Sequence, residues 1–169
     1  SNETKRNRSN SKNNFHFANP EIFVLTNEAF GSEQVRQSID RLEKTGKSAI
    51  FCVGLPPENY PRVAQEQVQR RIDYLAIEQN AWKLAAYDKR CIVVETKTEL
   101  DWAVKNGKIS VWAPAKMLLD AKNPPNFDLR QILNLSEWLA NEFGTEYLTV
   151  IGDIPNNDCS IKIETIPVK

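Results

Sequence analysis

Short apolar runs alternate along this chain with segments in which apolar residues recur every three or four positions. Such runs favour β-strands, and the recurring pattern favours amphipathic helices. The first helix is expected to begin after Ser32, a good N-cap, and to end at Gly46. Strands are predicted over 22–26, 48–55, 91–95, 109–113, 147–152 and 160–166, and helices over 33–45, 61–87, 99–106, 117–119 and 127–144.

This alternation of strands and helices predicts an α/β fold. We expect a three-layer, Rossmann-like sandwich, with helices on both faces of a mostly parallel sheet of about six strands. Residues 160–166 alternate between polar and apolar, which is typical of a half-exposed edge strand. The loop before them is short, so an antiparallel edge is predicted there. Thr98 and Asp101 have the spacing of a capping box for the helix over 99–106.

The longest predicted helix, over 61–87, has apolar residues on one side, at spacings of three, four or seven. An amphipathic helix normally turns such a side toward the core, so burial of this side is expected. The four tryptophans of the chain also fall on or near apolar faces, and core packing is expected for them too. The helix residues are Ala64, Val68, Ile72, Leu75, Trp82 and Ala86, and the other tryptophans are Trp102, Trp112 and Trp138.

Composition and charge divide the chain into two parts. It has 169 residues, of which 41% are hydrophobic and 26% charged, as in ordinary globular proteins. Residues 1–19 are rich in Asn and Ser and carry four basic residues against one acidic residue. We expect a disordered basic tail over 1–19, followed by a single α/β domain over 20–169.

Several classes of function are excluded by what the sequence lacks. No apolar run approaches the ~18 residues that would span a bilayer, so no membrane association and a cytoplasmic location are expected. The three cysteines, Cys52, Cys91 and Cys159, are far apart and are expected to be reduced thiols. His16 is the only histidine, which excludes a Ser-His-Asp triad and argues against a zinc site.

Three carboxylates are the candidate site residues. Glu95 and Asp153 are placed where two predicted strands end, and Asp158 follows in the next loop. Ligands collect at the carboxyl ends of parallel strands, so these side chains are expected at one edge of the sheet. Carboxylate oxygens there would hold Mg²⁺, with Glu95 as general base or ligand and the two aspartates as ligands.

The segment over 90–158 resembles the Toprim domain of primases and topoisomerases. The matching positions are Glu95 after a strand, Gly107 after a helix, and Asp153 after a later strand. Thr96 stands where that family has glycine, and the second aspartate of its DxD motif is missing. The resemblance implies Mg²⁺-dependent chemistry on phosphodiester bonds, of nuclease or primase type.

Other interpretations of the same residues stay open. Glu95 and Lys97 have the ExK form of restriction-endonuclease-like nucleases, with Asp73 as the upstream acid. A small-molecule pocket around Asn27, Glu95 and Asp153 is a further alternative. The interpretation we favour is a non-catalytic binding or interaction domain with a protein or nucleic-acid partner, associated with nucleic-acid handling. That interpretation predicts a contiguous exposed apolar patch.

Overall fold

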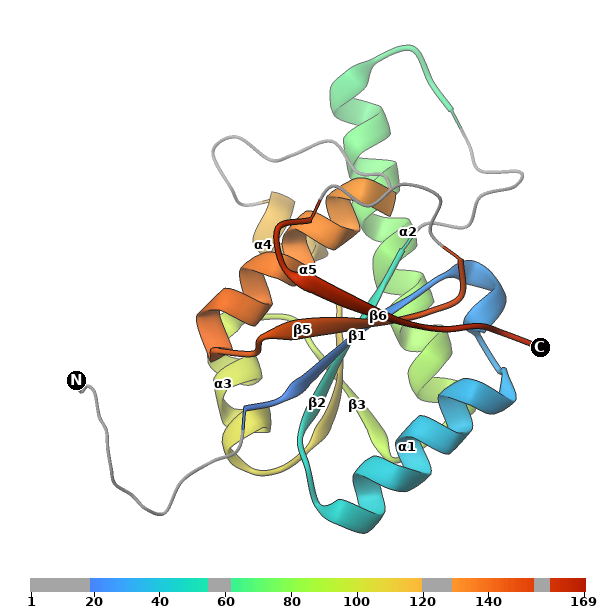
Figure 1. Ribbon diagram of the computed structural model, residues 1–169. Coiled ribbons are helices and arrows are strands. Elements are labelled where there is room, and N and C mark those ends of the chain that lie inside the picture. The colour runs from blue at the N-terminus through green and yellow to red at the C-terminus, as the bar shows by residue number, and fades with distance from the viewer. Residues whose placement is uncertain (1–18, 55–61, 120–128, 154–158) are drawn as a thin grey trace.

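A computed structural model describes residues 19–54, 62–119, 129–153 and 159–169 (Figure 1). The tail predicted over 1–19 therefore lies outside the described residues except for Asn19. The described chain contains six strands and five α-helices, with a short 3-10 helix, η1, over Asn27–Ala29. The strands are β1 (Glu21–Leu25), β2 (Ala49–Val53), β3 (Cys91–Val94), β4 (Ile109–Trp112), β5 (Tyr147–Ile151) and β6 (Lys162–Ile166).

All six strands form one parallel sheet in the order β3-β4-β2-β1-β5-β6. The predicted α/β fold with a six-stranded, mostly parallel sheet is confirmed, but the antiparallel edge is wrong. β6 runs parallel to β5, with Tyr147 beside Lys162 and Ile151 beside Ile166. A five-residue strand is about 17 Å long, whereas the ten residues over 152–161 can reach about 33 Å. The connection is therefore long enough to return to the start of β5.

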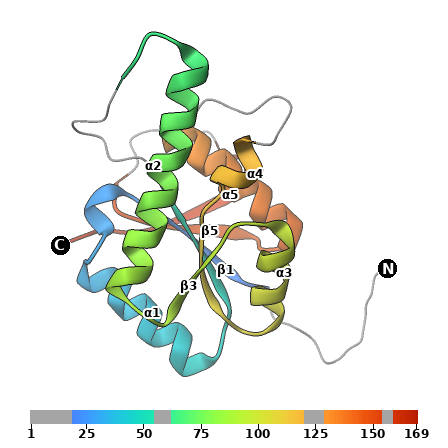
Figure 2. The same ribbon diagram turned by 180° about the vertical axis from the view of Figure 1, so that it is seen from behind.

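The helices cover both faces of the sheet (Figures 1 and 2). From β1 to β3 the chain moves toward one edge of the sheet, and from β3 to β5 it moves back past β1. Right-handed crossovers in opposite directions place their helices on opposite faces. Thus α1 and α2 cover one face, α3 and α5 cover the other, and α4 packs against α2. The bounds are α1 (Glu33–Thr45), α2 (Glu66–Tyr87), α3 (Lys97–Lys105), α4 (Ala115–Leu119) and α5 (Leu129–Phe143).

The core follows the strands that have helices on both sides. Every residue of β1 and β2 is buried, as their continuous apolar runs predict. Phe23 and Phe51 are register partners on these strands, and their rings stack at 4.6 Å between centroids. The N-cap of α1 is also as predicted, because the Ser32 hydroxyl accepts a hydrogen bond from the Val35 N–H and Gly46 ends the helix with a φ of 72°.

Candidate functional site

The predicted acidic site is divided by the strand order. Glu95 follows β3 at one edge of the sheet, whereas Asp153 follows β5, and β4, β2 and β1 lie between those strands. Four strand spacings separate β3 from β5 by about 19 Å. A single Mg²⁺ holds its ligands at about 2.1 Å, so the structure does not bring these two carboxylates together. Asp158 lies outside the described residues, among which no cluster of three or more His, Cys, Asp or Glu side chains is placed to hold a metal.

The helix that follows Glu95 is capped by a different acid. The Glu99 carboxylate accepts hydrogen bonds from the backbone N–H groups of Glu95 and Thr96, at 2.8 and 3.1 Å. The Thr96 hydroxyl in turn accepts from the Glu99 N–H, which completes a capping box, so the box predicted at Thr98 and Asp101 is wrong. These backbone hydrogen bonds lower the pKa of Glu99. The N-terminus of α3 is thus already occupied by its own side chain.

The endonuclease-like arrangement of acids and lysine is not formed either. Lys97 forms ion pairs with Asp101 and Glu142, and its ammonium lies 5.0 Å from the centre of the Phe143 ring. Lys97 therefore faces α5, on the opposite side of the sheet from α2. Asp73 lies within α2, where it accepts a hydrogen bond from Gln69 at 2.8 Å.

The carboxyl ends of β1 and β5 are packed against each other. The chain leaves these neighbouring strands in opposite directions, which is where α/β proteins usually bind ligands. Here the Thr26 N–H and hydroxyl both donate to the Ile151 carbonyl, at 3.1 and 3.2 Å. Buried Gly152 lies directly against the Thr26 side chain, with a φ of 112°. The Thr26 side chain therefore takes up the space beside Gly152, while Asn27 and Asp153 are exposed.

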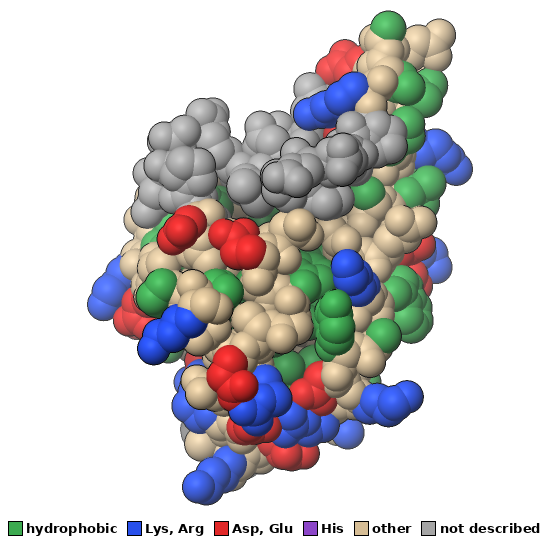
Figure 3. All heavy atoms as spheres, turned by 90° about the vertical axis from the view of Figure 1, so that its right-hand side faces the viewer, with side chains coloured by type: hydrophobic (Ala, Val, Ile, Leu, Met, Phe, Trp, Pro, Cys, Tyr) green, Lys and Arg blue, Asp and Glu red, His purple; other side chains and the backbone are tan. Residues whose placement is uncertain are grey.

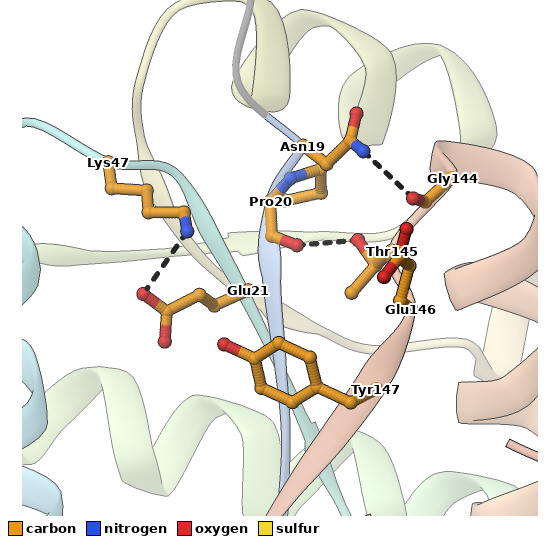
Figure 4. A pocket seen from close by; sticks show the side chains of 8 residues that line it. All are labelled: Asn19, Pro20, Glu21, Lys47, Gly144, Thr145, Glu146 and Tyr147. Atoms are coloured by element: carbon orange, nitrogen blue, oxygen red, sulfur yellow. Dashed lines mark hydrogen bonds and ion pairs between the residues drawn. The ribbon is translucent and has the colours of Figure 1, made fainter. Parts of the chain in front are cut away.

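A small pocket of about 170 Å³ opens at the amino ends of the strands, beside the start of β1 (Figure 4). Its polar groups bond to one another: Thr145 donates to the Pro20 carbonyl at 2.6 Å, and Asn19 donates to the Gly144 carbonyl at 2.8 Å. Pockets for small molecules are commonly larger, at about 300–1,000 Å³. These contacts hold the start of β1 against the start of β5, so we assign this pocket a structural role.

Glu21, which also lines this pocket, is a buried carboxylate with two cationic partners. Arg41 donates to it through two hydrogen bonds of 2.7 and 2.8 Å, and the Lys47 ammonium lies 3.7 Å away. Burial by itself would raise the pKa of Glu21, but the Arg41 hydrogen bonds and the two positive charges outweigh it and lower the pKa. The carboxylate is thus held ionised as the anchor between β1 and α1.

The feature that stands out is the surface of α2. Four of the seven exposed large hydrophobic side chains in the described chain belong to this helix: Val68, Leu75, Trp82 and Tyr87. Trp82 is 55% exposed, and Val68 and Leu75 are each more than 40% exposed. Figure 3 shows hydrophobic side chains along the column at its right, where α2 runs and where its upper end projects beyond the rest of the molecule.

The opposite side of α2 faces the sheet and α4. Tyr74, Ile77, Ala81 and Leu84 are at most 1% exposed, and Gln69 and Asp73 are buried beside them. Gln69 accepts from the Val63 N–H at 2.7 Å and donates to Asp73, so these two polar side chains have partners. The expectation that the side with Val68, Leu75 and Trp82 is buried is therefore wrong, because a second apolar side of the same helix packs in the core.

The remaining tryptophans divide in the same way. Trp112 is buried, as predicted, and stacks on Trp138 at 6.3 Å between ring centroids. Trp138 and Trp102 are exposed, so core packing was the wrong expectation for them. They lie on α5 and α3, and the Lys108 ammonium lies over the Trp102 ring at 5.9 Å. They are thus on the opposite face of the sheet from α2.

A scan against protein-family models and a search of the curated proteins found no match for this chain. Among the described helices, none combines the length and the apolar character that crossing a membrane requires. On the geometry of the molecule, the candidate site is the outward side of α2, which is the side with Val68, Leu75 and Trp82.

Proposed function

We propose that this protein is a non-catalytic interaction domain that binds a protein partner through the outward side of α2. The observation that carries the proposal is the exposed apolar row of Val68, Leu75 and Trp82 along one helix. Contiguous exposed apolar surface on a folded domain is a mark of an interaction site. Burying each of these side chains in an interface would contribute on the order of 1–2 kcal/mol, given that each is already about half covered.

The chemistry of this surface favours a protein partner over a nucleic acid. Nucleic-acid binding depends on cations set against phosphates, whereas the centres of protein interfaces are apolar and rich in aromatic residues. The outward side of α2 has the apolar side chains of Val68, Leu75 and Trp82 along its middle, and the exposed Arg71 and Lys83 lie only on its two flanks. A surface of this kind fits an amphipathic helix laid along it.

A reducing compartment, such as the cytoplasm, is the location that we propose for this activity. Cys52 and Cys91 are free thiols, and both are buried. Secreted domains commonly pair their cysteines, and unpaired buried thiols are typical of proteins kept in reducing surroundings.

Photocrosslinking from α2 tests the proposal. A benzophenone amino acid at position 75 is expected to give a discrete crosslinked species when the purified protein is irradiated in an extract of its source cells. The species is expected to disappear when Trp82→Glu is added, because a charge in the apolar row opposes burial. The same probe at position 102 is the control, since Trp102 on α3 is at least as exposed, at 53% against 41% for Leu75. Equal, diffuse labelling from both positions would contradict the proposal.

A further inference from the structure

The outward side of α2 has the residue spacing of a two-stranded coiled coil. Val68, Leu75 and Trp82 are seven residues apart, and Ile72, Gln79 and Ala86 follow each of them by four. This alternation of four and three continues over 68–86, which is almost the whole helix. In heptad terms, Ile72, Gln79 and Ala86 take the a positions, and Val68, Leu75 and Trp82 take the d positions.

The seam, formed by these a and d residues of α2, is accessible along its length. At 3.6 residues per turn, positions 68–86 of this seam lie on the side of α2 opposite Ile77 and Leu84, which face the core. Gln79 and Ala86 are exposed like the d residues, and Ile72 is half-buried. Figure 2 shows α2 in the foreground of the molecule, in front of the sheet. A second helix can therefore lie along it without displacing any of the described helices and strands.

We infer that the partner of α2 is α2 of a second copy of this chain, in a parallel pair. This inference rests on the proposed function and specifies its partner. Isoleucine at a and leucine at d favour a parallel two-stranded arrangement, as Ile72 and Leu75 provide. Gln79 is the one polar residue in the seam, and two Gln79 amides facing each other can each donate and accept a hydrogen bond. A polar residue at a single a position fixes the register of such a pair.

The charges beside the seam select the parallel orientation. Glu78 is at a g position and Lys83 at the following e position, so in a parallel pair Glu78 of each copy meets Lys83 of the other. Arg71, at the preceding g position, meets Ala76. In the antiparallel register that keeps all six seam residues in contact, Glu78 instead meets Glu78 of the other copy. Opposite charges are thus brought together only in the parallel pair.

The pair is expected to be reversible at moderate concentration. α2 is already folded by its own domain, so association does not bear the cost of forming the helix. The seam involves one helix of each copy, so the pair is expected to come apart on dilution. The purified protein should therefore pass from one chain to two as its concentration rises.

Sedimentation velocity over a concentration series tests this inference. The wild type is expected to shift from monomer to dimer, Leu75→Glu to stay monomeric, and Trp102→Glu, on α3, to behave as the wild type. A wild type that is monomeric at every concentration would overturn the inference, as would an undiminished dimer of Leu75→Glu. If such a monomer still gave a Trp82-dependent adduct with another protein from position 75, the proposed function would stand and only self-pairing would fail. If it gave no adduct, both would fail.

Charge reversal tests the orientation. Glu78→Lys and Lys83→Glu are each expected to weaken the dimer about three- to tenfold, because two attractive pairs become repulsive. The double variant Glu78→Lys with Lys83→Glu is expected to restore the wild-type dissociation constant. In an antiparallel dimer Glu78→Lys only replaces one like-charged pair with another, so unchanged association of the single variants would overturn the parallel arrangement.

Discussion

Replacing Gly152 by alanine is expected to lower the free energy of unfolding by about 3–5 kcal/mol. A β-carbon at this position would overlap the Thr26 hydroxyl and lie 2.8 Å from Thr26 Cβ and Cγ2. Thr26 is 3% exposed and holds the Ile151 carbonyl, so it cannot move aside without breaking that contact. The Gly152 N–H also donates to the Ile166 carbonyl at 2.9 Å, which ties the ends of β5 and β6 together.

Gly46→Ala is the matched control for this variant. Gly46 also has a positive φ, of 72°, but nothing lies within 4 Å of the place that its β-carbon would take. Its substitution should therefore lower the free energy of unfolding by only about 1 kcal/mol, because alanine disfavours a positive φ. Urea denaturation of both variants measures the difference. Equal losses of unfolding free energy would show that the close approach of Gly152 to Thr26 does not exist.

Ile77→Ala is expected to destabilise the protein by about 3–4 kcal/mol, whereas Leu75→Ala should lower its stability by only about 1 kcal/mol. The two residues lie two positions apart on α2, on different sides of it. Ile77 is 0% exposed and leaves a cavity in the core when shortened, but Leu75 is 41% exposed. Alanine has a higher helix propensity than leucine and isoleucine, so a loss of stability in either variant reports burial and not helix propensity.

Denaturation of these two variants at low protein concentration, where the wild type is a monomer, gives both values. The comparison decides which side of α2 faces the core, and the proposed function depends on that orientation. A larger loss for Leu75→Ala than for Ile77→Ala would mean that α2 is turned the other way. The row of Val68, Leu75 and Trp82 would then be core, as the sequence pattern first suggested.

That orientation could not be predicted from periodicity because α2 has two apolar sides. Tyr74, Ile77, Ala81 and Leu84 are spaced by three and four, as are Val68, Ile72 and Leu75 on the far side. Either series matches an amphipathic helix. Which one is buried depends on where the sheet lies, and the buried polar pair Gln69 and Asp73 gave no sign of this in the sequence. A helix that packs on one face of a sheet can bury only one of its sides. The second apolar series in the sequence of α2 was therefore the sign of an interaction surface.

The strands themselves were easier to predict than their order in the sheet. Continuous apolar runs such as those of β1 and β2 require cover on both faces, and this alone indicates central strands of a parallel sheet. The order β3-β4-β2-β1-β5-β6 arises from contacts between segments that are distant in the sequence. The local pattern of apolar and polar residues carries no information about these contacts. For that reason Glu95 and Asp153 were both placed correctly at strand ends, yet their distance from each other could not be foreseen.

The cap of α3 shows a similar ambiguity on a smaller scale. Thr96 and Glu99 have the same spacing as Thr98 and Asp101, and both pairs precede apolar residues. Glutamate is long enough to reach back to the N-cap N–H, as Glu99 does, and it is the usual partner in such a box. Side-chain length therefore decides which of the two pairs forms the capping box, and spacing alone does not distinguish them.

The most direct test of the central claim, that α2 binds a protein through its outward side, is thiol labelling at position 75. Burial raises the pKa of Cys52 and of Cys91 to about 12, so in a Cys159→Ser background a Leu75→Cys thiol is expected to be the reactive one. Trp102→Cys in the same background is the control. If α2 binds a protein through its outward side, labelling at 75 is fast in dilute protein and slows in concentrated protein or cell extract, while labelling at 102 does not change. Equal rates at the two positions under all three conditions would contradict it.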